Sequence, residues 1–192
     1  MIRRFVAYFI DWYLALILMN AVLLCAAFSL TGKVYAGALP LTFFPDNMQL
    51  ILLMSLLLIE VALYVLIPRC LWRGQTLGKR LMRIRVVVKD GSDVGAVRLL
   101  FRDLVCIAIV EGCFSPISNF IRNYLMLFLD EGAIQLTVWF SWAAGFVSIL
   151  IMIFNARRMM LHDVLAGTVV ETVGSDSDGG GAVGHPDDGA ME

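Results

Sequence analysis

The chain has 192 residues, of which 60% are hydrophobic and 16% charged, and its net charge is −1. Soluble domains are about 45–50% apolar and about 25% charged, so this composition excludes an ordinary water-soluble domain and indicates a lipid bilayer as the surroundings. The mean hydropathy of +0.83 points the same way.

Four segments are apolar over the length of about 20 residues that a membrane-spanning helix needs. They are residues 5–30, interrupted by Asp11 and Asn20; 49–68, with Glu60 near the middle; 99–121, containing Asp103 and Glu111; and 132–154. The first run is longer than the apolar core of a signal peptide, about 7–15 residues, so we expect it to be retained as a span. The predicted fold is an all-α integral membrane protein with four transmembrane helices in one domain, residues 1–173.

Basic residues gather between the second and third predicted spans. Residues 69–102 hold nine of the fifteen Lys and Arg residues, the amino terminus holds two, and residues 157–158 hold two more. If both termini and the connector share one side, thirteen of the fifteen lie there, and Lys33 and Arg122 lie on the other. Basic loops stay in the cytoplasm. The sequence therefore predicts a protein of the cell (inner, cytoplasmic) membrane with both termini cytoplasmic.

Within the connector, residues 69–98, apolar positions 77, 81 and 84 recur at helical spacing. This predicts a short amphipathic helix on the membrane surface. The β-branched run 85–89 before Asp90-Gly91 predicts a short strand or extended segment. Candidates for contact with anionic lipid headgroups, which attract clustered basic residues, are Lys79, Arg80, Arg83 and Arg85. The tail, residues 174–192, is rich in Gly, Ser and Asp and is expected to be disordered.

Three carboxyl groups inside the predicted spans are candidates for a proton or cation relay: Asp11, Glu60 and Glu111. A central Asp costs about 2.5–3.5 kcal/mol to insert, and such groups persist when protonated, paired or facing a polar cavity. The second and third spans run antiparallel, which permits Glu60 and Glu111 to face each other. The structural alternative for this pair is a neutral, hydrogen-bonded carboxyl.

Other chemistry finds little support. The segment GQTLGKR, residues 74–80, is one residue short of a phosphate-binding loop, and Arg80 stands where Ser or Thr would bind magnesium. His162 and His185 are too far apart in sequence for a metal site, and no Ser/His/Asp or Cys/His arrangement has motif support. We expect no enzyme activity, no metal or other cofactor, and no nucleic-acid partner.

Three motifs resemble a known family when taken in order: RRFVAYFID (3–11), GQTLGKRLMRIRVVVKDG (74–91) and RRMMLHDVLAGTVV (157–170). Together they are similar to the RDD family of small bacterial membrane proteins, named for one arginine and two aspartates. Matching motif to motif places these residues at Arg4, Asp11 and Asp163. Because Arg4 and Asp163 are both expected at the cytoplasmic interface, we hypothesise that they form one cluster with Asp11.

The resemblance implies a multi-pass membrane protein of largely unassigned function. Transport of unknown ligands is suggested for the family, and cation/proton exchange for some members. The first hypothesis is therefore a transporter or transport-associated protein that exchanges cations for protons. The alternative is a non-transporting membrane subunit or scaffold whose connector recruits partners or anionic lipid. Four spans are few to enclose a pathway, so a transporter of this size needs a homo-oligomer or a membrane partner.

The charge distribution makes a direct prediction about topology. On a background without the native cysteines, a single cysteine near Lys33 is expected to react with a membrane-impermeant reagent added from outside, whereas one at Ser92 is not. Ready labelling at Ser92 with none near Lys33 would overturn the assignment.

Overall fold

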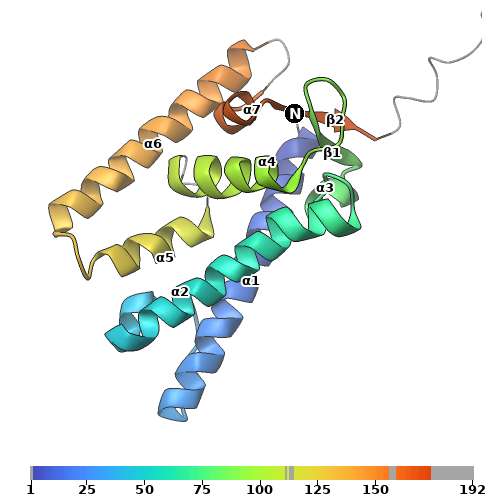
Figure 1. The fold of residues 1–192 in the computed structure, drawn as a ribbon. Helices are drawn as coiled ribbons and strands as arrows, with labels where there is room; N and C mark the ends of the chain where they lie inside the picture. The colour runs from blue at the N-terminus through green and yellow to red at the C-terminus, as the bar shows by residue number, and fades with distance from the viewer. Residues whose placement is uncertain (1, 111, 113–114, 156–158, 174–192) are drawn as a thin grey trace, which may run out of the picture.

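The computed structural model describes residues 2–110, 112, 115–155 and 159–173, and it is mostly helical (Figure 1). Three helices among these residues are long and apolar enough to cross a membrane. They are α1 (Ile2–Thr31), α2 (Asp46–Val61) continued by η2 (Ala62–Leu71), and α6 (Glu131–Phe154). This agrees with the prediction of a helical membrane protein. The tail for which disorder was predicted lies outside the described residues.

Helix α1 buries one narrow stripe and exposes its remaining surface. The buried positions recur every fourth residue, at Ala7, Asp11, Ala15, Met19, Leu23 and Ala27. Residues four apart share one side of an α-helix, and the alanines among them let neighbouring backbones approach closely. Large apolar side chains such as Phe5, Phe9 and Phe28 are exposed, as expected of a helix that faces lipid.

The second long helix changes its hydrogen-bonding pattern at Ala62. Up to there α2 is α-helical; beyond it η2 is a π-helix that contains Pro68. Proline has no N–H to donate, so its presence inside a helix requires the surrounding bonds to adjust. The end of η2 is closed by the N–H of Trp72 donating to Ile67 O (3.1 Å) and that of Gly74 donating to Pro68 O (2.7 Å).

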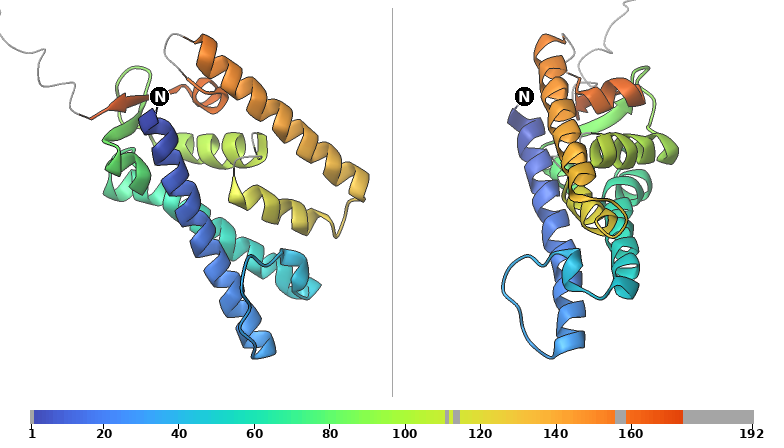
Figure 2. Two further views of the ribbon diagram at one scale, coloured as in Figure 1. Left: turned by 180° about the vertical axis from the view of Figure 1, so that it is seen from behind. Right: turned by 90° about the vertical axis from the view of Figure 1, so that its left-hand side faces the viewer.

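The third predicted span, residues 99–121, is not one continuous helix. The segment consists of α4 (Ala96–Leu100), the π-helix η3 (Phe101–Val110) and α5 (Pro116–Leu125). The backbone at Ser115 is extended, with φ −107° and ψ 130°. Pro116 explains the break, because proline disfavours the helical conformation of the residue before it. Both figures show α4 lying across the long helices (Figures 1 and 2). The relay candidate Glu111 lies outside the described residues.

Helix α5 leads into α6, whose inward face carries small residues. Ser141, Gly145 and Ser148 are buried on this face, and Arg122 Nη2 of α5 donates to Ser141 Oγ (2.7 Å). The opposite face exposes large apolar side chains, among them Trp139, Phe140 and Phe146. Helix α6 therefore has a polar contact inward and an apolar surface outward.

The fold is not purely helical, because a two-stranded antiparallel sheet joins the connector to the carboxy-terminal region. β1 (Ile84–Val88) pairs with β2 (Thr168–Thr172), with Val86 opposite Val170. β1 follows α3 (Leu77–Leu81) and lies where the sequence predicts a strand or extended segment, shifted by one residue. β2 was not predicted, and it corrects the expectation of an all-α chain. Val86 packs in a small apolar core with Val65, Val94 and Leu99.

One end of the molecule gathers the start of α1, α3, the sheet and α7 (Leu161–Ala166), as both figures show (Figures 1 and 2). A larger apolar core lies further along the helices and includes Met19, Leu23, Leu56 and Ile117, all fully buried.

Helix α3 packs directly on α1 because residue 78 is glycine. A Cβ at this position would lie 2.2 Å from Ala7 O and 3.0 Å from Asp11 Cγ. Gly78→Ala is therefore expected to push α3 away and to lower the free energy of unfolding by about 1–3 kcal/mol. Denaturant unfolding of the detergent-purified protein measures this change.

Gly95→Ala is the matched control. Gly95 has an ordinary φ of −76°, and nothing lies within 4 Å of a Cβ built there. Its substitution is expected to change stability by no more than about 0.5 kcal/mol. Equal stability of the two variants would contradict the close approach of α3 to α1.

Candidate functional site

Asp11 fastens the connector to the first long helix. Its carboxyl is buried, with Oδ1 accepting the N–H of Gly78 (2.7 Å) and Oδ2 accepting the hydroxyl of Thr76. The Thr76 hydroxyl also caps α3 by accepting the N–H of Lys79 (3.5 Å). A buried carboxylate is costly unless it is hydrogen-bonded. These bonds therefore hold the start of α3 against α1.

Lys79, expected at the lipid surface, is half-buried and lies in the field of three carboxylates. Asp11, Asp103 and Asp163 all act on its ammonium group. Burial lowers the pKa of Lys79, and the charge of Arg102 lowers it further, against the opposing effect of the carboxylates. The Lys79 side chain therefore belongs to the interior charge network.

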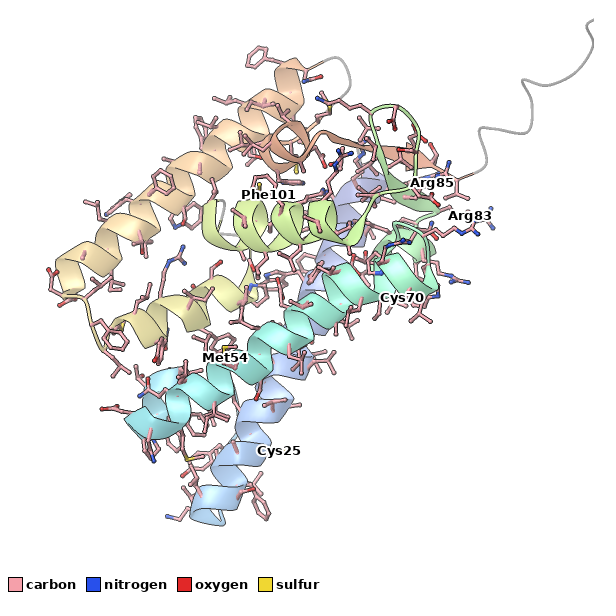
Figure 3. The ribbon with its side chains drawn as sticks, in the orientation of Figure 1. Cys25, Met54, Cys70, Arg83, Arg85 and Phe101 are labelled. Carbon is pink, nitrogen blue, oxygen red and sulfur yellow. The ribbon has the colours of Figure 1, made fainter. Side chains whose placement is uncertain are left out.

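The other predicted basic residues of the connector lie nearer the surface. Arg80 is exposed and stacks over the ring of Trp72, with its guanidinium carbon 4.8 Å from the ring centroid. Arg83 is exposed, and Arg85 on β1 lies 3.9 Å from Glu171 on β2. Figure 3 shows Arg83 and Arg85 at the end of the molecule that carries the sheet.

Asp163 and Arg102 form a buried ion pair that joins α7 to η3. Arg102 Nε and Nη2 lie 3.1 and 3.0 Å from Asp163 Oδ1, and Arg102 Nη1 lies 2.9 Å from Asp103 Oδ1. The hydroxyl of Thr168 donates to the same Asp163 oxygen (3.3 Å), and His162 Nε2 is 3.7 Å from it. The side chains of Arg102, Asp103 and Asp163 are each at most 4% exposed.

The charge state of Asp163 follows from these contacts. Burial on its own would raise the pKa of Asp163, but the Arg102 guanidinium and the neighbouring His162 ring favour the carboxylate. Hydrogen bonds from Arg102 and from the N–H of Met160 act in the same direction, and the resulting pKa is about 2. Asp163 is therefore a carboxylate at any physiological pH.

Arg4 occupies a different part of this end of the molecule. Its Nη2 donates to Val170 O on β2, which ties the start of α1 to the sheet. The hydrogen bonds of Asp163 come from Arg102, Thr168 and Met160, and those of Asp11 come from the connector. Arg4 thus contacts the sheet, whereas Asp11 and Asp163 both act on the ammonium group of Lys79. The hypothesis that the three motif residues form one cluster stays a prediction. The sequence analysis counted Arg102 among the basic residues that set the topology, and its pairing with Asp163, 61 positions along the chain, has no local sequence signal.

Among the described residues, Glu60 is the buried carboxyl whose hydrogen bonding is least complete. It is 4% exposed within the second long helix, and its Oε1 accepts only a long bond from the Ser115 hydroxyl (3.4 Å). Neither Glu60 Oε2 nor Asp103 Oδ2 has a hydrogen-bond partner among the described residues. The two carboxyls interact electrostatically, and Tyr64, one turn further along the helix, interacts with Glu60 and Asp11. Asp11, Tyr64, Glu60 and Asp103 therefore form a series of buried ionisable groups in which each interacts with the next.

A cavity of about 100 Å³ lies beside these groups. Its lining includes the carboxyl-bearing Asp11, the aromatic residues Tyr64 and Trp72, and aliphatic residues of α1, η2 and α3. One water needs about 10–15 Å³ of such volume and polar partners to stay. The cavity has the volume of several waters, but its lining is mainly apolar, and both carboxyl oxygens of Asp11 already accept hydrogen bonds from the connector.

The comparisons with known proteins identify the family. The family model "RDD family" matches residues 1–167. The chain belongs to the RDD family. It is also similar to the uncharacterized protein YckC of Bacillus subtilis (strain 168), with 30% identity over 111 residues, which are 57% of this chain and 55% of that protein. The chain thus aligns with about half the length of this curated relative. No solved structure matches.

The family match confirms the resemblance read from the three motifs. The positions assigned from them, Arg4, Asp11 and Asp163, all fall within the matched region. In this RDD protein, all three make contacts that join elements far apart in the sequence.

Asp163→Asn is expected to destabilise this RDD protein. Because the folded-state pKa of about 2 lies below the ordinary 3.8, folding favours the carboxylate by roughly 2 kcal/mol at neutral pH. That contribution is fully present above about pH 5 and is lost as the pH falls toward 2. The Asn variant should be less stable at pH 7 and should lack this part of the acid dependence, as measured by denaturant unfolding in detergent.

Asp130→Asn provides the control, because Asp130 is exposed at the N-cap of α6, where Asn and Asp are about equally good. Its stability and acid dependence should stay close to those of the unsubstituted protein. An Asp163→Asn variant that behaves like this control would contradict the role of the buried ion pair.

Proposed function

We propose that this RDD protein exchanges protons for cations across the cytoplasmic membrane, with Glu60 as the central proton-carrying group. The observation that supports this proposal is the incomplete hydrogen bonding of a carboxyl inside a long apolar helix. A carboxyl there is costly as a bare anion, and it is stabilised when it takes up a proton or a cation. Alternation between these two partners is what an exchanger requires.

The contrast with the other carboxyls supports a separate role for Glu60. Asp11 and Asp163 each accept several hydrogen bonds, which fix them in place. Among the described residues, the buried carboxyl oxygens without a partner belong to Glu60 and Asp103. A group with unused bonding capacity can gain a ligand without first breaking the fold.

The break in the third segment also supports the proposal. Non-helical backbone at membrane depth is tolerated where it is buried in protein or lines a water-filled cavity, and transporters build ion sites from interrupted helices. Ser115, at the break before α5, donates to Glu60. The interruption and the under-bonded carboxyl therefore lie together.

A route toward Glu60 is offered by the polar groups at the sheet end of the molecule. The 100 Å³ cavity reaches Asp11 and Tyr64, and Tyr64 lies one turn from Glu60. We place this end in the cytoplasm, since the basic connector, the start of α1 and strand β2 belong to it. A complete path across the membrane would need a second copy or another subunit.

Ion flux in proteoliposomes tests the proposal. With a pH-sensitive dye inside and a sodium or potassium gradient imposed, the protein is expected to drive a pH change. Glu60→Gln should abolish this change, because the amide cannot carry a proton, while the variant still inserts and folds. Glu111→Gln is expected to have the same effect.

Glu131→Gln is the matched control, since Glu131 is exposed at the start of α6, and its flux should equal that of the unsubstituted protein. Asp11→Asn should weaken the docking of α3 as well as flux, so its thermal stability is measured in parallel. Flux that survives the double substitution Glu60→Gln/Glu111→Gln would show that the carboxyl relay is wrong. The scaffold hypothesis would then be preferred.

A further inference from the structure

A polar groove of about 390 Å³ lies between the first turn of α1 and the sheet. One wall carries Arg3 and Arg4 of α1 beside Ile2, and the other is formed by Ile84 of β1 and residues 170–172 of β2. None of its lining residues belongs to the cavity at Asp11 or to the contacts of Glu60. The groove is therefore a second feature, distinct from the proposed exchange site.

The groove is electropositive. It contains two arginines and one glutamate, Glu171, and the charge of that glutamate is offset by Arg85 at 3.9 Å. Arg3 is exposed, so its guanidinium is accessible to a ligand. Arg4 donates to Val170 O and so holds the two walls together. Arginine binds phosphate oxygens through paired N–H donors, which makes phosphate the anion that this chemistry suits best.

The position of the groove at the first turn of α1 indicates that the phosphate belongs to a lipid headgroup. Helix α1 has 30 residues and is about 45 Å long at 1.5 Å per residue, whereas the hydrocarbon core is about 30 Å thick. Its first turn therefore reaches the layer of lipid headgroups. Ile2 and Phe5, next to the arginines, are 79% and 71% exposed and offer apolar surface to an acyl chain.

We propose that this groove binds the phosphate group of an anionic phospholipid. The two arginines contact the phosphate, Arg4 also fixes the wall formed by β2, and the apolar side chains of the first turn contact the lipid tail. Bound lipid would join the start of α1 to the sheet, next to the contact that Arg4 already makes. This inference does not depend on proton/cation exchange.

Native mass spectrometry of the full chain, titrated in detergent with phosphatidylglycerol or phosphatidylcholine, tests the proposal. The unsubstituted protein is expected to bind one phosphatidylglycerol more tightly than phosphatidylcholine. Since one basic residue near an anionic lipid surface contributes about a fivefold gain in affinity, Arg3→Gln should weaken that binding roughly fivefold, and Arg3→Lys should largely restore it. Glu171→Gln should instead strengthen it, because it removes the acidic group from the groove.

Arg98→Gln is the control for diffuse attraction, since Arg98 of α4 is exposed and lies outside the groove. It should leave the affinity nearly unchanged. Equal loss in Arg98→Gln and Arg3→Gln, or equal binding of the two lipids, would overturn the site. Displacement of the lipid by low-millimolar inorganic phosphate would show that free phosphate, and not lipid, is the ligand.

Discussion

The pairing of Asp163 with Arg102 is the contact on which the arrangement of the carboxy-terminal region depends. Removing two charges from water is costly, and their attraction compensates only when geometry is good and the remaining lone pairs are hydrogen-bonded. Here three donors besides the Arg102 guanidinium act on the Asp163 carboxylate or lie beside it: Met160 N–H, the Thr168 hydroxyl and the His162 ring. The position of α7 is thereby fixed against η3.

From that pair the constraint continues into the sheet. Thr168, which donates to Asp163, is the first residue of β2, and Gly167 before it has a left-handed conformation (φ 65°) that turns the chain out of α7. β2 then pairs with β1 of the connector. The same connector is held at its other end by Asp11, through Gly78 and Thr76. Asp11 therefore holds the connector directly, and Asp163 holds it through β2. The connector packs against the long helices as part of the same domain.

Much of this organisation could be predicted from the sequence, because long apolar runs and segregated charges leave few alternatives. Three long helices coincide with predicted spans, and the strand after Lys79-Arg80 was anticipated from its β-branched residues. The pairing of that strand with residues 168–172 could not be predicted. It depends on the position of α7, which is fixed by the contact of Asp163 with Arg102, 61 positions away in sequence. The same applies to Arg102, whose partner is visible only in three dimensions.

The break in the third segment has a local sequence signal, but the high hydropathy of the segment led to its prediction as one continuous span. Ser115-Pro116 interrupts helical geometry by sterics alone, but the residues on both sides are apolar enough to read as one span. The charge of the Lys79 side chain suggested the membrane surface, whereas the Thr76 cap and the glycine at position 78 place α3 against α1. Periodicity gives the face of a helix, and close backbone approach decides what that face touches.

The distribution of hydrogen bonds divides the buried carboxyls into two kinds. Asp11 and Asp163 are saturated by bonds to distant segments, so changing their charge would release those segments. Glu60 has one long bond, and Asp103 uses one oxygen, so their charge can change at a smaller structural cost. Buried polar atoms without partners are rare in native proteins and call for an explanation. Because the single bond of Glu60 comes from the residue at the helix break, movement of α5 would alter the surroundings of this carboxyl directly, and a change in its protonation would act back on α5.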